Sequence, residues 1–342
     1  SMKVLLIGSG GREHALAWKL RQSPQVEKIF CAPGNAGIGE IAELVSIKVD
    51  DLTALLKFAK TSKIDFTVVG PELPLTLGIV DLFEKDGFRI FGPTKLAAEI
   101  EGSKVYAKHF MKKYKIPTAE FRTFDASQRY AAERYINDIP VPIVIKANGL
   151  AAGKGAAVCE TKDKALEVLQ EMMVQKLYGE AGEQVVIEEY MVGEEASLLA
   201  ITDGVQFVTL PPAQDHKRIL DGERGKNTGG MGAYAPTPFV TEKILEKIKR
   251  SIIRPTIYGL AKEGRRYKGC LYCGLMLTRT GPKVVEFNCR FGDPETQVIL
   301  PLVEGDFAEL LLAAINGTLQ NLRVKHRRAT AVCVVIASGG YP

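Results

Sequence analysis

Short apolar runs alternate with longer amphipathic stretches along the first hundred residues, and this order predicts strands and helices in alternation. Four apolar runs stand out, at residues 2–11, 28–32, 66–70 and 89–92. Strands that alternate with helices form parallel sheets, whose ligand sites lie beyond the carboxyl ends of the strands. We therefore expect an α/β chain that begins with a small Rossmann-like domain.

The same pattern continues through the rest of the chain. Further strands are expected within residues 142–145, 184–187, 196–210, 269–277, 283–287 and 328–336. Helices are expected at residues 97–114, 164–175 and 241–264. Residues 211–232 hold little apolar content and many glycines and charges, which predicts a long loop. Such a loop is uncommon in a compact domain unless it contacts a ligand.

The strongest local feature is PIVIKANGLAAGKG, at residues 142–155. Its strand delivers Lys146 to a loop that holds Gly149, Gly153, Lys154 and Gly155. Glycines let backbone amides approach a phosphate closely, and a lysine ahead of the loop adds a point charge. A Walker loop would need Ser or Thr after the second lysine, and the G-x-G-x-x-G dinucleotide motif is absent. The run predicts a flap over nucleotide phosphates; a hairpin with a glycine-rich turn is the plain alternative.

Two further stretches are candidates for anion binding. The first strand ends in GSGG, so that Gly10, Gly11 and Arg12 stand at a helix start, where backbone amides can hold an anion. The third glycine of the dinucleotide motif is missing, which disfavours NAD, and glycines that serve only the turn are the alternative. In the long loop, Asp215 and Lys217 belong to a compact polar cluster. After them, Thr228, Gly229, Gly230 and Met231 resemble a second cradle for phosphate or carboxylate.

A polar face is expected on the strand at residues 283–287 and just beyond it. Period-two alternation places Glu286, Asn288 and Arg290 on one side, opposite an apolar side. A carboxylate and an amide oxygen are two hard ligands for Mg²⁺, and a guanidinium can clamp a phosphate. The alternative, a solvated sheet face, fits poorly with the RFGDPE sequence that begins at Arg290.

Composition narrows the functional class. The net charge is +5 over 342 residues, and the basic residues are scattered rather than gathered in a stripe with aromatic residues, so nucleic-acid binding is not expected. The six cysteines lie mostly in apolar runs, and Cys270 and Cys273 should point to opposite faces of a strand. We expect free thiols and a cytoplasmic location. No apolar run is long enough to span a membrane.

With these residues in hand, the chain resembles the glycinamide ribonucleotide synthetase family of ATP-grasp ligases. The resemblance rests on eight motifs in order: GSGGREHA, GPE-x-PL, GPT…EGSK, VIKANGLAAGKG, IEEYM-x-GEE, AQDHKR, NTGGMG and EFNCRFGDPETQ. It implies an ATP-grasp fold with an N-terminal Rossmann-like domain at 1–102 and a central domain at 103–120 and 190–325. It further implies a small lid subdomain at 121–189 and the start of a truncated C-terminal domain at 326–342. In animal relatives this synthetase is the first part of a multifunctional purine enzyme.

The resemblance also implies roles for individual residues. Lys104 and Lys146 would contact the ATP phosphates under the 149–155 flap. The adenine hinge would comprise Glu188, Glu189, Tyr190 and Met191, with Glu195 on the ribose. Glu286 and Asn288 would bind Mg²⁺ or Mn²⁺. The small-molecule substrates, glycine and 5-phosphoribosylamine, would lie between the 10–12 turn, Asp215, Lys217, the 228–231 loop and Arg290.

The implied reaction joins glycine to 5-phosphoribosylamine through a glycyl phosphate, with release of ADP and phosphate. Two departures stand against the pattern. Many ATP-grasp enzymes have a second acidic metal ligand on the neighbouring strand, but the strand at 269–277 carries no acid, which matches this family better than the superfamily. Residues 223–226 read ERGK where the family usually has Asp-x-Gly-Pro. A ligase for another carboxylate and amine, or an inactive nucleotide-binding module, are the competing hypotheses.

Overall fold

The computed structural model describes residues 1–149, 155–174 and 179–342. The N-terminal sheet is parallel throughout, in the order β3–β2–β1–β4–β5. Its strands are β1 (Met2–Gly8), β2 (Val26–Pro33), β3 (Glu43–Leu44), β4 (Phe66–Val69) and β5 (Ile90–Phe91). The expected α/β fold with a parallel N-terminal sheet is confirmed.

Helices cover both faces of this sheet, so β1 is buried on both sides. Val4 and Leu6 share a core with α1 (Gly11–Arg21) and α12 (Phe307–Asn316). Leu5 and Ile7 share another core with α2 (Leu52–Thr61) and α4 (Ile79–Lys85). The turns after β1 and β4 leave the same edge of the sheet, and α3 (Glu72–Thr76) begins there.

A central antiparallel sheet has the order β11–β10–β14–β15. Its strands are β10 (Glu194–Thr202), β11 (Phe207–Thr209), β14 (Gly269–Thr278) and β15 (Gly281–Asn288). Alternating residues of β14 pack into different cores: Cys273 lies in the core that contains Leu5, and Cys270 lies in the core that contains Val4. The two thiols therefore face opposite sides, as expected, and all six cysteines are free.

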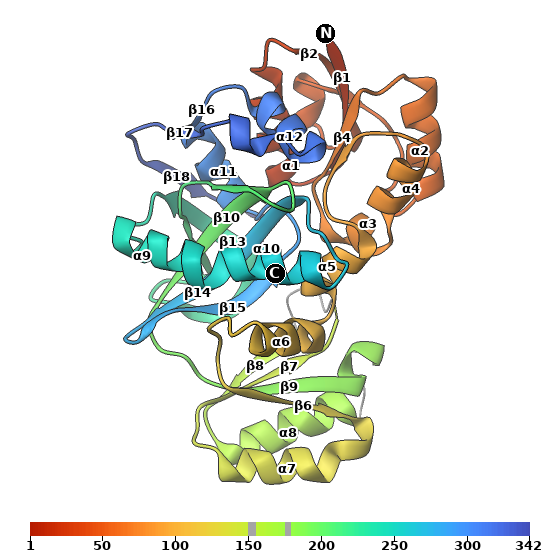
Figure 1. The fold of residues 1–342 in the computed structure, drawn as a ribbon. Helices are drawn as coiled ribbons and strands as arrows, with labels where there is room; N and C mark the ends of the chain where they lie inside the picture. Colours follow the sequence, from red (N-terminus) through yellow and green to blue (C-terminus); the bar gives the residue numbers. More distant parts are fainter. Residues whose placement is uncertain (150–154, 175–178) are drawn as a thin grey trace.

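A third sheet, which we call the lid sheet after the lid predicted at residues 121–189, lies in the lower part of Figure 1 and has the order β6–β9–β7–β8. Its strands are β6 (Phe121–Asp125), β7 (Ile143–Ala147), β8 (Ala156–Cys159) and β9 (Gln184–Glu189). Helices α7 (Arg129–Asp138) and α8 (Lys162–Met173) cover one face around a separate core. The other face is turned toward α6 (Lys104–Lys113), which lies between this sheet and the central one (Figure 1).

Two sequence expectations about local structure were wrong. The expected single helix at residues 97–114 is two helices, α5 (Lys95–Gly102) and α6, because Ser103 takes an extended conformation and its hydroxyl caps α6. The expected loop at residues 211–232 contains the paired strands β12 (Gln214–Leu220) and β13 (Arg224–Ala235). The exposed faces of these two strands are polar, so the hydropathy pattern did not indicate strands here. They form a sheet with β18 (Ala331–Val334).

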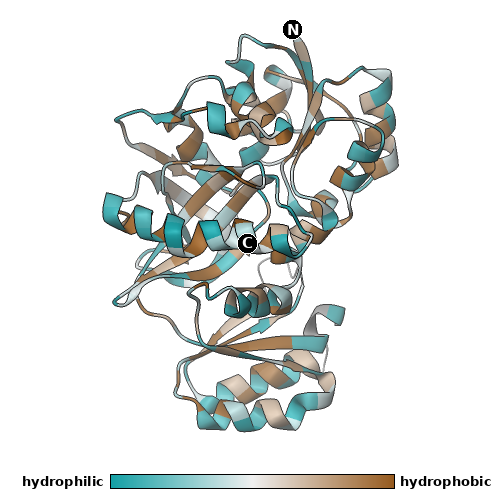
Figure 2. Ribbon diagram, in the orientation of Figure 1, coloured by the Kyte–Doolittle hydropathy of each residue, from teal (hydrophilic) through white to brown (hydrophobic). Residues whose placement is uncertain are grey.

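The remaining elements link these sheets. Residues 242–262 run as α9 (Glu242–Ile248), a π-helical turn (Lys249–Ile253) and α10 (Arg254–Lys262), and α11 (Glu295–Ile299) follows β15. Strands β16 (Val303–Glu304) and β17 (Lys325–His326) pair near the end. The short 3₁₀ helices span Ile38–Glu40, Ala126–Gln128, Gly179–Glu183, Leu300–Leu302 and Leu319–Asn321. In Figure 2 the hydrophobic colour gathers on the strands, while α7 and α9 carry much of the hydrophilic colour.

Candidate active site

Strand pairing in the lid sheet brings Lys146 and Glu188 together. Val144 lies opposite Glu188 in the β7–β9 ladder, so Lys146, two residues on, is its diagonal neighbour on the same face. Lys146 Nζ lies 2.6 Å from Glu188 Oε1, and Lys108 Nζ from α6 lies 2.7 Å from Glu188 Oε2. All three side chains are buried. One carboxylate thus holds two lysines that come from different elements.

Charge pairing favours the ionised forms of Lys146 and Glu188 despite their burial. Burial acts to raise the pKa of Glu188, but Lys146 and Lys108 outweigh it and the pKa lies below its ordinary value. Burial acts to lower the pKa of Lys146, but Glu188 outweighs it and the pKa is raised. For Lys108 burial dominates and its pKa is lowered. Lys146 therefore stays a cation in a site of low dielectric constant.

The described part of the glycine-rich loop is attached to the start of α6. Lys104 Nζ donates to the carbonyl oxygens of Ala147 and Gly149, at 3.0 and 2.8 Å. The Asn148 side-chain oxygen accepts from the backbone N–H of Val105 at 3.1 Å. Of the expected flap residues, Gly153 and Lys154 lie outside the described residues, while Gly149 and Gly155 are described.

The expected adenine hinge lies at the end of β9. Glu188 and Glu189 are the last two residues of that strand, and Tyr190 and Met191 follow it. The side chain of Glu188 is paired with Lys108 and Lys146. Any contact of Glu188 with an adenine ring would therefore be made by its backbone. Glu189 Oε1 accepts from the backbone N–H of Glu120 at 3.1 Å. Across the site, the carbonyl of Glu195 accepts from Gln214 Nε2 at 2.8 Å.

Glu286 interacts electrostatically both with Lys104 and Lys146 and with Lys217 on β12. Burial acts to raise its pKa, but Lys217, Lys146, Arg290 and Lys104 outweigh it, so the pKa is lowered. Asn288 lies two residues on along β15 and is buried. This donor set of one carboxylate and one amide oxygen fits Mg²⁺, which commonly takes few protein ligands together with substrate phosphates. The described residues contain no group of three or more His, Cys, Asp or Glu that could hold a metal ion.

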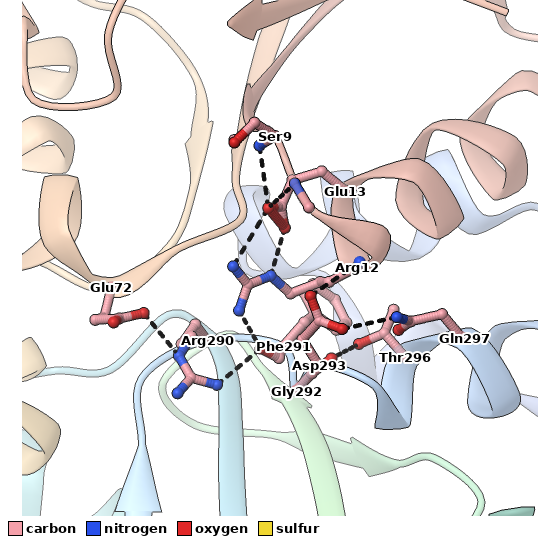
Figure 3. A network of polar contacts seen from close by, with 12 residues as sticks. Ser9, Arg12, Glu13, Glu72, Arg290, Phe291, Gly292, Asp293, Thr296 and Gln297 are labelled. Atoms are coloured by element: carbon pink, nitrogen blue, oxygen red, sulfur yellow. Dashed lines mark hydrogen bonds and ion pairs between the residues drawn. The ribbon is translucent and has the colours of Figure 1, made fainter. Parts of the chain in front are cut away.

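Arg290 is held by carboxylates from the N-terminal half. Its Nε donates to Glu72 Oε2 at 3.0 Å (Figure 3). The same Nε lies 3.6 Å from Glu101 Oε1. Burial acts to raise the pKa of Glu72, but Arg290 outweighs it and the pKa is lowered. The Glu101 carboxylate also accepts from the backbone N–H of Cys289 at 2.8 Å. Arg290 is therefore positioned before any substrate arrives.

The turn after β1 lies close to the segment that begins with Gly292 and Asp293, shortly after Arg290 in the chain (Figure 3). Backbone N–H groups of Ser9 and Gly10 donate to Glu13 Oε1, at 3.3 and 3.1 Å. The N–H of Arg12 donates to Asp293 Oδ2 at 3.2 Å, and its guanidinium pairs with Glu13. Several groups of the expected anion site thus already hold carboxylates, while Gly11 opens the helix.

The β12–β13 hairpin brings its polar residues to the same place. Lys217 Nζ lies 3.9 Å from Asp215 Oδ2. Burial acts to lower the pKa of Lys217, but Asp215, Glu286, Glu195 and Glu295 outweigh it and the pKa is raised.

The 228–231 stretch packs beside this lysine. Thr228 Oγ1 donates to the carbonyl of Lys217 at 2.7 Å, and the N–H of Gly229 donates to the Tyr341 hydroxyl at 3.1 Å. Gly230 has φ +119°, and a Cβ there would lie 2.4 Å from Pro294 Cδ. The carbonyl of Met231 accepts from the N–H of Val335 at 2.9 Å. Glycine is required at position 230 by both conformation and space.

Comparison with known proteins agrees with this arrangement. The model of the phosphoribosylglycinamide synthetase N domain matches residues 2–101, and that of the ATP-grasp (A) domain matches residues 102–296. The chain belongs to the phosphoribosylglycinamide synthetase family.

Relatives in this family match along the whole chain. A phosphoribosylamine–glycine ligase of Caldanaerobacter subterraneus subsp. tengcongensis is 52% identical over 341 residues, which cover 100% of this chain and 81% of the relative. One from Salmonella typhi is 49% identical over 344 residues, with 100% and 80% covered. The crystal structure of the Thermotoga maritima phosphoribosylamine–glycine ligase has a TM-score of 0.84 and 36% identity, and the match covers 99% of this chain and 81% of that one.

Several residues of this family member's site were not singled out by sequence reasoning. They are Glu13, Glu72, Glu101, Lys108, Asp293 and Glu295. Most lie inside motifs that were recognised, such as GPE, EGSK and RFGDPE, where position in the motif was a signal that went unused. Lys108 lies outside every motif, and only the packing of α6 against the lid sheet shows its pairing with Glu188.

Proposed function

We propose that this protein is a carbon–nitrogen ligase that uses ATP to join glycine to 5-phosphoribosylamine, giving glycinamide ribonucleotide, ADP and phosphate, a step of purine biosynthesis. Similarity along the whole of this chain to relatives named phosphoribosylamine–glycine ligase supports the substrates. The observation that carries the proposal is the convergence at Glu286, whose charge interacts with Lys104 and Lys146 on one side and Lys217 and Arg290 on the other. ATP phosphates and an acyl acceptor could meet there.

In the first step, the carboxylate of glycine attacks the γ-phosphate of ATP and forms glycyl phosphate. Lys146, fixed by Glu188, and Lys104 neutralise the phosphate charge, and Arg290 stabilises the transferring group. Glu286 and Asn288 would hold Mg²⁺ or Mn²⁺, which supplies charge neutralisation on the nucleotide phosphates. Catalysis here is positioning together with electrostatics, and no enzyme nucleophile is required.

In the second step, the amine of phosphoribosylamine attacks the acyl carbon and phosphate leaves. Asp215, Lys217 and the 228–231 loop, together with the 10–12 turn, form the surface proposed for this substrate. The lid, at residues 121–189, would close over the nucleotide and keep water from the acyl phosphate. No helix among the described residues is long and apolar enough to cross a membrane. The cytosolic location predicted from the free thiols stays a prediction.

The decisive experiment measures ADP release with Mg-ATP, glycine and phosphoribosylamine generated in situ, omitting each substrate in turn. Full turnover that requires both glycine and phosphoribosylamine is expected. A panel of other carboxylates and amines tests the alternative ligases. Turnover with another pair, and none with glycine and phosphoribosylamine, would overturn the substrate assignment.

A further inference from the structure

Glu295 is the first residue of α11 and directly follows the Gly-Asp-Pro sequence at residues 292–294. Its side chain is buried. A Cβ built on Gly292 would lie 1.9 Å from Glu295 Oε2 and 2.6 Å from the ring of Tyr272. Only glycine at position 292 leaves room for this carboxylate beside the Tyr272 ring. The tyrosine ring is itself fixed, because its hydroxyl lies 2.7 Å from Ser197 Oγ.

The titratable groups whose charges act on Glu295 come from separate elements. They are Asp215 and Lys217 on β12, Tyr272 on β14, and Arg290 after β15. The pKa of Glu295 is raised to about 7, first by burial and then by the charge of Asp215, against the opposing effect of Lys217 and Arg290. A carboxylate with such a pKa can both take up and release a proton near neutral pH.

Asp215 provides a second, independent observation. Its side chain is 7% exposed, and among the described residues its Oδ2 atom has no hydrogen-bond partner. Among the ion pairs of the described residues, its partner is Lys217, whose Nζ lies 3.9 Å away, beyond hydrogen-bond distance. A buried carboxylate oxygen without a donor is costly, and a ligand that brings an N–H group would satisfy it.

We propose that Glu295 is the general base that takes the proton from the attacking amine of the second substrate, while Asp215 accepts a hydrogen bond from that same amine. This assignment rests on the proposed function and adds a catalytic residue to it. The nitrogen lone pair forms the new bond to the acyl carbon of glycyl phosphate. The bond from that carbon to the phosphate oxygen breaks, phosphate leaves with the electron pair, and one N–H proton passes to the Glu295 carboxylate.

The two half-reactions can be separated in an experiment. Hydroxylamine traps glycyl phosphate as glycine hydroxamate without phosphoribosylamine, and it is nucleophilic without help from a base. Glu295→Gln keeps the shape of the side chain and removes the base. We expect hydroxamate formation within about threefold of wild type, and formation of the ribonucleotide product lowered roughly 100-fold or more. Retained hydroxamate formation also shows that the variant is folded.

The pH dependence supplies the matching readout. The wild-type rate of the amine step should fall as the pH drops below about 7, where Glu295 takes up a proton. The ratio of variant to wild-type rate at each pH cancels changes in the supply of phosphoribosylamine, and it should rise toward low pH. Glu27→Gln, an exposed glutamate on β2, is the matched control and should leave both reactions unchanged.

Other outcomes overturn the assignment. Ribonucleotide formation at the wild-type rate in Glu295→Gln excludes a general base at this position. If Glu295→Gln loses hydroxamate formation and has a raised KM for glycine, Glu295 binds glycine and is not the base for the amine. Failure of every substrate combination in the wild-type enzyme overturns the proposed function, which is a distinguishable result.

A second variant covers the case in which Glu295→Gln does not fold. Asp215→Asn removes the like charge that raises the pKa of Glu295. In this variant, the fall in the rate of the amine step on the acid side should therefore occur at lower pH than in the wild type. An acid limb that stays in place overturns the proposal.

Discussion

On the lid side of the site two lysines share the carboxylate of Glu188, whereas on the β12 side several carboxylates share Lys217. Cations dominate the first region, and Lys104 adds one more beside it. Carboxylates dominate the second, and one oxygen of Asp215 has no donor among the described residues. The first region is suited to phosphates and the second to an amine. This difference is what a ligase needs if it activates a carboxylate with ATP and then passes it to an amine.

Glu286 lies between the two regions, and its removal should have the largest effect. Glu286→Gln deletes a proposed metal ligand and a carboxylate whose charge interacts with lysines on both sides. We expect kcat/KM for ATP to fall by about 100-fold or more, because preorganised charge stabilisation is lost. Steady-state ADP release over a range of Mg²⁺ concentrations measures it. Turnover at the wild-type rate would show that Glu286 binds no metal.

Lys146 tests the cationic region alone. Lys146→Met removes a proposed phosphate contact and leaves Glu188 with Lys108 as its partner. The dissociation constant for ATP, measured by calorimetry, should rise roughly 10-fold or more, which corresponds to the loss of one charge-assisted contact. Lys164→Met, which removes an exposed lysine on α8, is the matched control and should not change it. Unchanged ATP affinity in Lys146→Met would remove this residue from the phosphate site.

The two regions should also respond to pH with opposite signs. The pKa of Glu188 is lowered from 4.5 in the folded protein, so its contribution to stability is present above pH 4.5 and is lost as the pH falls through the folded value. The pKa of Glu295 is raised from 4.5 to about 7, so its contribution is present below pH 4.5 and is lost as the pH rises through about 7.

Urea unfolding of the wild type, Glu188→Gln and Glu295→Gln between about pH 2 and pH 8 covers both pH windows and measures both slopes. Relative to the wild type, Glu295→Gln should gain up to about 3 kcal/mol as the pH rises across this range, since one pKa unit is worth about 1.4 kcal/mol. Glu188→Gln should lack the loss on the acid side. Parallel curves for all three proteins would contradict the charge assignment of both regions.

The smallest effect is expected at the tip of the β12–β13 hairpin. The ERGK segment adds two positive charges there, but Arg224 and Lys226 are exposed. Surface charges are screened by salt and contribute little. Replacing both with alanine should change the KM for each substrate by less than about twofold. A change in KM above 10-fold would show that the hairpin tip contacts a substrate, and the basic side chains at 224 and 226 would then belong to the site.

Alternation and glycine placement predicted much of this molecule from sequence. Glu286 and Asn288 share a face because β15 alternates, and Cys270 and Cys273 separate on β14 for the same reason. The parallel N-terminal sheet followed from strands that alternate with helices. The β12–β13 hairpin was missed because its residues are polar and glycine-rich, and its pairing depends on backbone hydrogen bonds that hydropathy does not register.

The sequence by itself determined the family, the ATP-grasp fold and most of the charged residues of the site, because local periodicity and motif spacing carry that information. Only the tertiary structure decided which charges meet. Lys108 reaches Glu188 from another element, and Glu72 reaches Arg290 across 218 positions. The charge of Asp215, on β12, acts on Glu295, on α11. Such pairs form because burial leaves a charged group no water, so its partner must be brought from whatever segment packs against it.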